Sequence, residues 1–217
     1  MTGEFQDKSI LITGASKGLG YICAQEFERR GAQLVMVARS SSKLEQLKST
    51  FSNPEKHLVF SADLVNRDSI QDLVKKGLEH SGGFDIVLHV LGGGYGFRDP
   101  LITWEQLDTL YKVNVGVAAE INRLVVPEMV EKKYGRLVHV GSIASQEATA
   151  SVGYNTVKSA LAAYVRSLGR ELAESRVVVS GILPGAFYAP ENSWERLKAT
   201  KPEVVKEFIE KNLPRKR

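Results

Sequence analysis

The chain has 217 residues, of which 43% are hydrophobic and 25% charged, as is ordinary for a globular protein with one buried core. Its formal net charge of +4 is small, and its cations are spread out except at residues 214–217, so no nucleic-acid surface is indicated. The single cysteine, Cys23, excludes an intrachain disulfide, favours a reducing compartment and is expected to be a small buried helix residue. The sequence shows neither a signal peptide nor a bilayer-spanning apolar run, so we expect a cytoplasmic protein without a membrane partner.

The first motif is a glycine-rich stretch, Thr13 to Gly20, between an apolar run at 9–12 and a helical pattern that begins near Leu19. Glycines allow the backbone to turn sharply beside a pyrophosphate, and the N-terminus of the next helix presents free N–H groups to that anion. A turn also needs glycine for purely conformational reasons. The motif alone therefore favours nucleotide binding and a plain turn equally.

Apolar runs and helical patterns alternate along the rest of the chain. Strands are predicted at 9–12, 34–37, 58–60, 85–91, 136–140 and 177–179. Helices are predicted at 21–30, ended by Gly31; at 41–51, capped by Ser41 or Ser42; at 66–79; at 103–131, with a kink or break at Pro127; and at 153–173.

Most of these strands are continuously apolar, which is typical of a parallel sheet covered by helices on both faces. Right-handed crossovers then predict a doubly wound, Rossmann-type α/β fold of six strands in a single domain, residues 1–217. Ligands bind such folds at the carboxyl ends of the strands. The residues that follow strands at that edge are Gly14, Asp63, Gly92, Ser142 and Pro184.

A tyrosine and a lysine have the spacing of a catalytic pair. Tyr154 and Lys158 are four positions apart on a predicted helix and therefore share one face. A nearby ammonium stabilises phenolate and lowers the tyrosine pKa, which makes the phenol a usable proton donor. Taken alone, such a pair more often consists of surface residues without a catalytic role. Ser142 adds a hydroxyl that can polarise a substrate carbonyl at the same edge. Asn114, inside a long predicted helix, either faces solvent or marks a local break that holds a water.

Together the motifs resemble the short-chain dehydrogenase/reductase family, including its 3-oxoacyl reductase-like members, over nearly the whole chain. The motifs are the glycine stretch, Asp63-Leu64, Asn114 to Gly116, Ser142, Tyr154 with Lys158, and Pro184-Gly185. The resemblance implies an NAD(P)-dependent enzyme that interconverts a carbonyl and an alcohol on a small-molecule substrate.

The resemblance also implies a role for each site residue. Tyr154 is expected to be the general acid/base and Ser142 to orient the carbonyl. Lys158 is expected to lower the tyrosine pKa and hold the nicotinamide ribose, while Asn114 supports a water relay to the lysine. Cofactor contacts are expected from Gly14, Ser16, Lys17, Gly18, Leu19, Gly20, Arg39, Asp63, Leu64, Leu91, Gly92, Tyr154, Lys158, Pro184, Gly185 and Phe187. No metal is implied, and residues 189–213 are expected to form a lid over the substrate.

The end of the second predicted strand indicates which cofactor is used. NAD-selective relatives carry an acidic residue there, which binds the ribose 2′-hydroxyl. Ala38 occupies that place and Arg39 follows it. Arg39 and Lys17 are either plain surface cations or partners of a 2′-phosphate, and we expect NADP(H) to be preferred over NAD(H).

The sequence departs from the family pattern at three places. His89-Val90-Leu91 stand where the family has two asparagines and an alanine, Ala189 stands where a threonine is common, and Ser142 and Tyr154 are only twelve positions apart. None of these changes alters a catalytic side chain.

Two histidines precede the site on neighbouring predicted strands. His89 and His139 each lie three positions before a residue of the ligand-binding edge, so we expect them side by side. A metal would need a third ligand, and none is evident, so a packed, hydrogen-bonded core pair is the better interpretation. Residues 92–96 are expected to form either a mobile loop by the substrate or a turn that requires positive φ.

Two alternative functions remain. A non-catalytic redox sensor or scaffold would not need the complete set of Tyr154, Lys158, Ser142 and Asn114, and a nucleotide-sugar epimerase would need a larger C-terminal domain. Specificity is expected in residues 189–213 and 94–100, where no constellation selects among keto acyl thioesters, sugars and small ketones.

Relatives continue past the segment that resembles residues 203–217 with another helix and a seventh strand. We expect either a shortened family member or part of a longer chain. The apolar sixth strand, 177–179, would otherwise be an exposed edge, so we expect it to be covered by further residues or by a second subunit in a homodimer or homotetramer.

Overall fold

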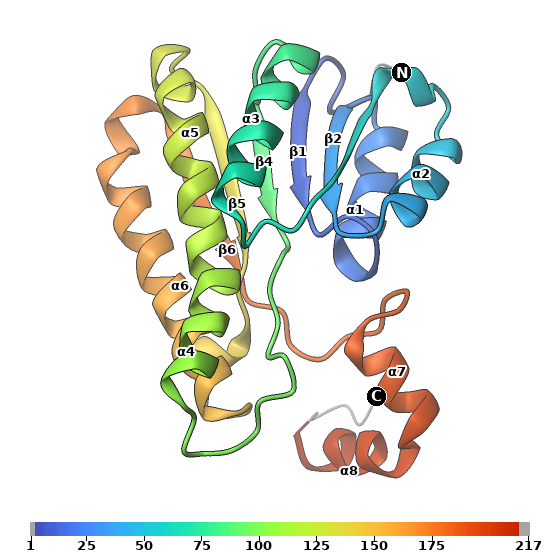
Figure 1. Cartoon of the computed structure of the whole chain (residues 1–217), viewed down its shortest axis with the longest axis vertical. Coiled ribbons are helices and arrows are strands. Elements are labelled where there is room, and N and C mark those ends of the chain that lie inside the picture. Colours follow the sequence, from blue (N-terminus) through green and yellow to red (C-terminus); the bar gives the residue numbers. More distant parts are fainter. Residues whose placement is uncertain (1–2, 213–217) are drawn as a thin grey trace.

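Residues 3–212, which a computed structural model describes, form a sheet of six parallel strands with the spatial order β3-β2-β1-β4-β5-β6 (Figure 1). The strands are β1 Ser9–Thr13, β2 Gln33–Ala38, β3 Leu58–Ser61, β4 Ile86–His89, β5 Gly135–Val140 and β6 Val177–Ile182. The order reverses between β1 and β4, which is where doubly wound folds bind nucleotides. The α/β fold expected from the sequence is confirmed.

Helices cover the sheet on both faces. On one face lie α3 (Arg67–Ser81), α5 (Val117–Glu131) and α6 (Val152–Glu171), whose apolar residues pack with Leu11, Val87 and Leu137. On the other face, α1 (Gly18–Arg29) and α2 (Ser41–Ser49) pack over β1 and β2. Alternate side chains of β1 and β2 therefore enter two separate cores, which explains why these strands are apolar without interruption.

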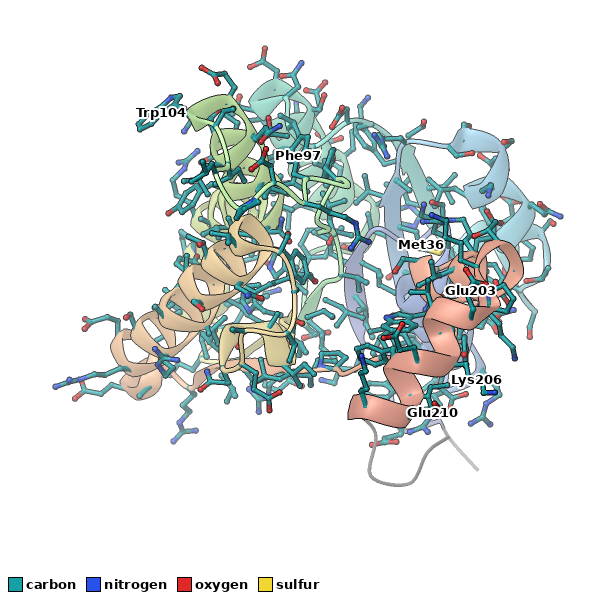
Figure 2. The ribbon with its side chains drawn as sticks, turned by 90° about the horizontal axis from the view of Figure 1, so that it is seen from below. Met36, Phe97, Trp104, Glu203, Lys206 and Glu210 are labelled. Carbon is teal, nitrogen blue, oxygen red and sulfur yellow. The ribbon has the colours of Figure 1, made fainter. Side chains whose placement is uncertain are left out.

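The helix predicted at 103–131 is divided into three parts. They are α4 (Trp104–Tyr111), a π-helical turn at Lys112–Gly116 and α5. Thr103 begins α4 with a capping box, and Trp104 projects into solvent from its first turn (Figure 2). Of the kink or break expected at Pro127, the break is wrong, because α5 runs through it to Glu131, while a kink stays a prediction. A proline removes only one helical hydrogen bond, and the buried Val125 and Met129 hold the helix against the core on both sides of it.

The cap of α2 and the end of β6 also differ from expectation. Ser40, not Ser41 or Ser42, caps α2 by accepting a hydrogen bond from the backbone N–H of Lys43. β6 continues to Ile182, three residues beyond the apolar run that predicted it. Cys23 is half-buried, not fully buried as expected, and packs against the apolar cluster that α1 and α2 form with the sheet. This partial burial raises the pKa of its thiol.

β4 ends at His89, two residues earlier than predicted. The next two backbone N–H groups, those of Val90 and Leu91, donate to the Thr13 hydroxyl at 3.1 and 3.2 Å instead of to a strand. The chain therefore leaves the sheet beside the glycine stretch. Gly93 and Gly96 then adopt positive φ angles of 151° and 78°, as the turn interpretation of residues 92–96 requires.

The predicted histidine pair is confirmed. His89 and His139 stack with ring centroids 4.5 Å apart, in register on β4 and β5. The Asn122 amide nitrogen donates to Tyr164, so its oxygen accepts from Nε2 of His89 at 2.8 Å. The same amide nitrogen lies 3.2 Å from Nε2 of His139, whose Nδ1 then donates to the Ser180 carbonyl. Burial lowers the pKa of both rings, that of His139 to about 4, so both are neutral.

After β6 the chain leaves the sheet and forms two short helices below its carboxyl edge (Figure 1). They are α7 (Ser193–Thr200) and α8 (Pro202–Asn212), which pack together through Trp194 and Phe208, with ring centroids 4.5 Å apart. Glu203, Lys206 and Glu210 follow one another along exposed positions of α8 (Figure 2). We call residues 187–212 the C-terminal arm.

The outer edge of β6 pairs with no strand within residues 3–212, and its Val178 is 49% exposed. Whether further residues or a second subunit cover this edge stays a prediction, and the tail at 213–217 lies outside the described residues. Within the described part of the chain, no helix is long and apolar enough to cross a membrane.

Candidate active site

The glycine stretch brings β1 and α1 together at the carboxyl edge of the sheet. Gly14 has a φ of 72°, and its backbone N–H donates to the Val37 carbonyl at 2.8 Å. A β-carbon on Gly20 would lie 2.5 Å from the Gly14 carbonyl oxygen, so only glycine allows α1 to pass this close to the turn. The N-terminus of α1 consequently points at the edge where β1 and β4 diverge.

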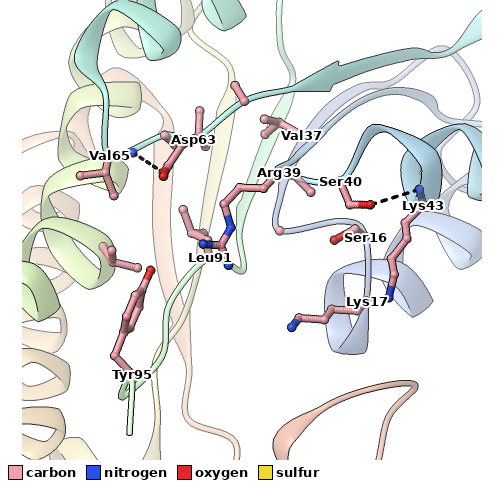
Figure 3. Close-up of a pocket in the computed structure, with 15 residues that line it drawn as sticks. Ser16, Lys17, Val37, Arg39, Ser40, Lys43, Asp63, Val65, Leu91 and Tyr95 are labelled. Atoms are coloured by element: carbon pink, nitrogen blue, oxygen red, sulfur yellow. Dashed lines mark hydrogen bonds between the residues drawn. The ribbon is translucent and has the colours of Figure 1, made fainter. Parts of the chain in front are cut away.

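A pocket lies beside this turn (Figure 3). Seven of the expected cofactor residues line it: Gly14, Ser16, Lys17, Arg39, Asp63, Leu64 and Leu91. Asp63 also accepts a hydrogen bond from the Val65 backbone N–H at 3.1 Å, which holds the turn after β3. The carboxyl ends of β1, β2, β3 and β4 therefore converge on one pocket, as parallel topology demands.

The pocket has a cationic rim formed by Lys17, Arg39 and Lys43 (Figure 3). Burial lowers the pKa of the Lys17 ammonium, and the positive charges of Arg196, Lys43 and Arg39 lower it further. Mutual repulsion of this kind means that an anion entering the rim is stabilised by more than one cation. Lys43 was not predicted from the sequence. It reaches the pocket only because it lies in the first turn of α2, the helix that follows β2.

Asn114 ties the π-helical turn to the loop after β4. Its amide nitrogen donates to the carbonyls of Gly93 and Leu110 at 3.0 and 2.9 Å, and its oxygen accepts from the Gly93 N–H at 3.1 Å. It is 2% exposed, so the solvent-facing alternative is wrong and the local break in the helix is confirmed. π-Helical turns of this kind occur frequently at functional sites.

Lys158 lies buried beneath the same loop. Its Nζ donates to the Val140 carbonyl at 3.0 Å and lies 5.6 Å from the centroid of the Tyr154 ring, so the two side chains share one face of α6 as expected. Burial lowers the pKa of the Lys158 ammonium to about 8. A β-carbon on Gly92 would lie 2.7 Å from Asn114 Oδ1 and 3.2 Å from Lys158 Nζ, so these two groups converge on the space that Gly92 leaves open.

The pKa of Tyr154 shifts in the direction opposite to expectation. Burial raises it above its usual value, and hydrogen bonding to the Ser142 hydroxyl lowers it only in part. Lys158 does not reverse this shift, because its Nζ is held by the Val140 carbonyl over the face of the ring. The phenol is therefore a protonated donor at neutral pH.

The remaining expected residues lie around these groups. Ser142 follows β5 and accepts a hydrogen bond from the Ala144 N–H at 3.2 Å. The carbonyl of Pro184 accepts from the Ile143 N–H at 3.2 Å, which places the 184–185 turn beside Ser142. Phe187 is 38% exposed at the start of the C-terminal arm. Tyr95, from the 92–96 stretch expected beside the substrate, also lines the pocket, as does Val113, which nothing in the sequence marked as ligand-facing.

A Rossmann-type pocket with a cationic rim, next to a buried lysine and a half-buried tyrosine and serine, defines the class of nicotinamide-dependent oxidoreductases that act on CH–OH groups. The chain belongs to the short-chain dehydrogenase family, whose model matches residues 8–199. The family uses NAD(P) and acts on small-molecule substrates. The finer resemblance to 3-oxoacyl reductase-like members is not tested by this match.

Among similar proteins, an uncharacterised oxidoreductase of Staphylococcus epidermidis is 30% identical over 188 residues, which span 86% of this chain and 81% of the relative. A similar Staphylococcus aureus oxidoreductase is 28% identical over 94% of this chain and 89% of its own. The solved structure of L-sorbose reductase from Gluconobacter frateurii, a complex with NADPH and L-sorbose, has a TM-score of 0.88 at 25% identity, covering 100% of this chain and 86% of the other. Levodione reductase has a TM-score of 0.88 at 26% identity, covering 99% and 86%.

The residues present fit an NAD(P) cofactor. Gly14 and Gly20 allow the backbone to pack closely enough to form the tight turn on which a pyrophosphate site depends, and Gly92 leaves space beside Lys158 and Asn114. The rim supplies cations for phosphate groups. Both ends of a dinucleotide therefore have matching groups along one edge of the sheet.

Proposed function

We propose that this protein is an NADP(H)-dependent carbonyl reductase in which Tyr154 donates the proton. The observation that carries the proposal is the convergence of Asn114 Oδ1 and Lys158 Nζ on the space left by Gly92, with the Tyr154 ring beside them. A purely structural role would not require a buried ammonium to be held at a ligand-binding edge, because burying a charge is costly.

The chain's own groups handle the proton. The nicotinamide, when bound, supplies the hydride that reduces the carbonyl carbon. The Ser142 hydroxyl holds the carbonyl oxygen, and the Tyr154 phenol gives that oxygen its proton, so the product is an alcohol. Lys158, still largely charged at neutral pH, stabilises the phenolate that remains, and Asn114, held by the loop at Gly93, supports a water relay to the lysine that returns the proton.

The cationic rim supports the preference for NADP(H). Ala38 leaves no carboxylate to repel a 2′-phosphate, and Lys17, Arg39 and Lys43 surround the place that such a phosphate would take. Cofactor titration tests this: NADPH should bind more tightly than NADH, and Arg39→Ala should remove much of the difference. Equal or tighter binding of NADH by the unaltered protein would contradict the preference.

The C-terminal arm supports two further parts of the proposal. Residues 189–212 lie below the carboxyl edge, where a lid would close over substrate, while the expected limit at 213 lies outside the described residues. The open edge of β6 supports a homodimer or homotetramer, for which light scattering is the test.

A panel of carbonyl compounds, assayed by loss of NADPH absorbance, tests the reaction. The solved reductases of L-sorbose and levodione make ketoses and cyclic ketones the first compounds to try. Tyr154→Phe should lower turnover by about 10²- to 10⁴-fold with unchanged NADPH affinity, because only the proton donor is lost. Tyr111→Phe, on the exposed side of α4, is the matched control and should keep its turnover.

The same assay separates the proposal from its rival, a non-catalytic redox sensor. A sensor would bind NADPH and reduce nothing in the panel. Near-normal turnover in Tyr154→Phe would instead keep the reaction and remove Tyr154 from its assigned role.

A further inference from the structure

The C-terminal arm touches the nucleotide pocket through a single tight turn. The carbonyl of Pro190 accepts a hydrogen bond from the Gly18 N–H at 2.7 Å. Gly18 is the first residue of α1, and the N–H groups at this helix end are those that a bound pyrophosphate would use. A neutral carbonyl of the arm therefore already engages one of the donors of the anion site.

The next residue of the arm, Glu191, contacts the cationic rim of the pocket. The Glu191 carboxylate forms an ion pair with Lys43, a member of the cationic rim. Burial and neighbouring cations lower the pKa of Lys17, and the negative charge of Glu191 partly offsets that shift, so Glu191 is close enough to affect a second rim cation. Consecutive residues of the arm thus contact the pyrophosphate end and the rim end of the pocket.

This turn is held in shape by the arm itself. Glu191 has a φ of 56°, which is uncommon for a residue with a side chain. Its N–H donates to the Glu195 carboxylate and its carbonyl accepts from Arg196, each at 2.5 Å. Asn192 caps α7 by accepting from the Glu195 N–H at 2.8 Å. Pro190 and Glu191 are therefore presented to the pocket as one unit.

We propose that the 190–191 turn is a built-in competitor of the cofactor: its carbonyl and carboxylate occupy anion-binding groups of the nucleotide pocket, and cofactor entry displaces both together. The proposal rests on the proposed nucleotide site. Because the two residues are adjacent, a dinucleotide that takes Gly18 must also break the pair between Glu191 and Lys43, whether or not it carries a 2′-phosphate.

The test is calorimetric titration of NADPH and NADH into the full chain. Glu191→Gln should bind both cofactors about two- to five-fold more tightly, the range expected when an exposed ion pair no longer has to be broken. In a Lys43→Met background the same substitution should give a smaller gain, because the partner is already gone. Glu203→Gln, which removes one exposed negative charge from α8, is the matched control and should change neither affinity.

The outcomes are distinguishable from those that test cofactor preference. Cofactor preference is judged from the ratio of NADPH to NADH affinity in the unaltered protein. The competitor role of the 190–191 turn is judged from the increase in affinity that Glu191→Gln causes with either cofactor. Unchanged or weaker binding in Glu191→Gln would overturn the proposal. An equal gain in Glu203→Gln, or a full gain without Lys43, would do the same, since each would reveal a general charge effect.

Discussion

The sheet with its helices and the C-terminal arm are stabilised in different ways. All five residues of β1 are buried, and two apolar clusters fill the space between the sheet and its helices. In the arm, no residue of α7 from Ser193 to Thr200 is buried, and the ion pair that joins the arm to α2 is exposed. Apolar burial contributes far more than exposed ion pairs, and Ala189 and Val205 are among the few buried apolar residues of the arm, so we expect the arm to open more easily than the sheet.

The candidate active site also has one part held by the sheet and its helices and another part contacted by the arm. Asn114 and Lys158 are held by backbone carbonyls of the sheet region, namely those of Gly93, Leu110 and Val140. The arm contacts only the cofactor end of the pocket, through Pro190 and Glu191. We therefore expect the groups that handle the proton to keep their positions when cofactor displaces the arm.

A core truncation is expected to produce the largest difference between the two regions. Leu137→Ala, in the centre of β5, should lower the free energy of unfolding by about 2–5 kcal/mol because it leaves a cavity in a closely packed core. Val204→Ala in α8, where the side chain is 42% exposed, should cost less than ~0.5 kcal/mol. Denaturant unfolding measures both, and similar losses would show that the arm is an integral part of the core.

Buried and exposed lysines should differ in how they couple stability to pH. The pKa of Lys158 is lowered to about 8 in the folded chain, so from there up to the unfolded value the unfolded state binds more protons. Its unfavourable contribution to stability is complete below pH 8 and is relieved as the pH rises through that window. Relative to Lys158→Met, the unaltered protein should gain about 2 kcal/mol between about pH 7.5 and 9.5.

Lys206→Met, on the exposed side of α8, is the control for this measurement and should follow the unaltered protein at both pH values. Parallel curves for the unaltered protein and Lys158→Met would mean that the Lys158 ammonium is solvated rather than buried.

The smallest effect is expected at the start of α7. Asn192→Ala removes the side chain that caps this helix, which costs about 1 kcal/mol of local helix stability. Hydrogen exchange should become faster at residues 193–200 while the midpoint of global unfolding stays unchanged, because the arm opens independently of the sheet. A lowered midpoint would show that the arm unfolds together with the sheet in one cooperative transition.

The sequence predicted the parts that burial and backbone geometry determine locally. Uninterrupted apolar runs indicated the strands, and Gly14 to Gly20 indicated the tight turn into α1. Lys43 and the 190–191 turn were not predicted, because they reach the pocket only through the packing of α2 and the arm. The direction of the Tyr154 pKa shift depends on burial and on the carbonyl that holds Lys158, and neither is visible in a Tyr-x-x-x-Lys pattern.

The π-helical turn at Lys112–Gly116 makes chain length itself a constraint. Such a turn carries more backbone per revolution than an α-helical turn, and one residue rotates a helix by about 100°. Removing a single residue there would allow α4 and α5 to merge into a regular helix, yet it would swing α4 around its axis and take Asn114 away from Gly93. Insertions and deletions should therefore be tolerated in surface loops and be rejected between Thr103 and Gly116, even at exposed positions of that stretch where a substitution is harmless.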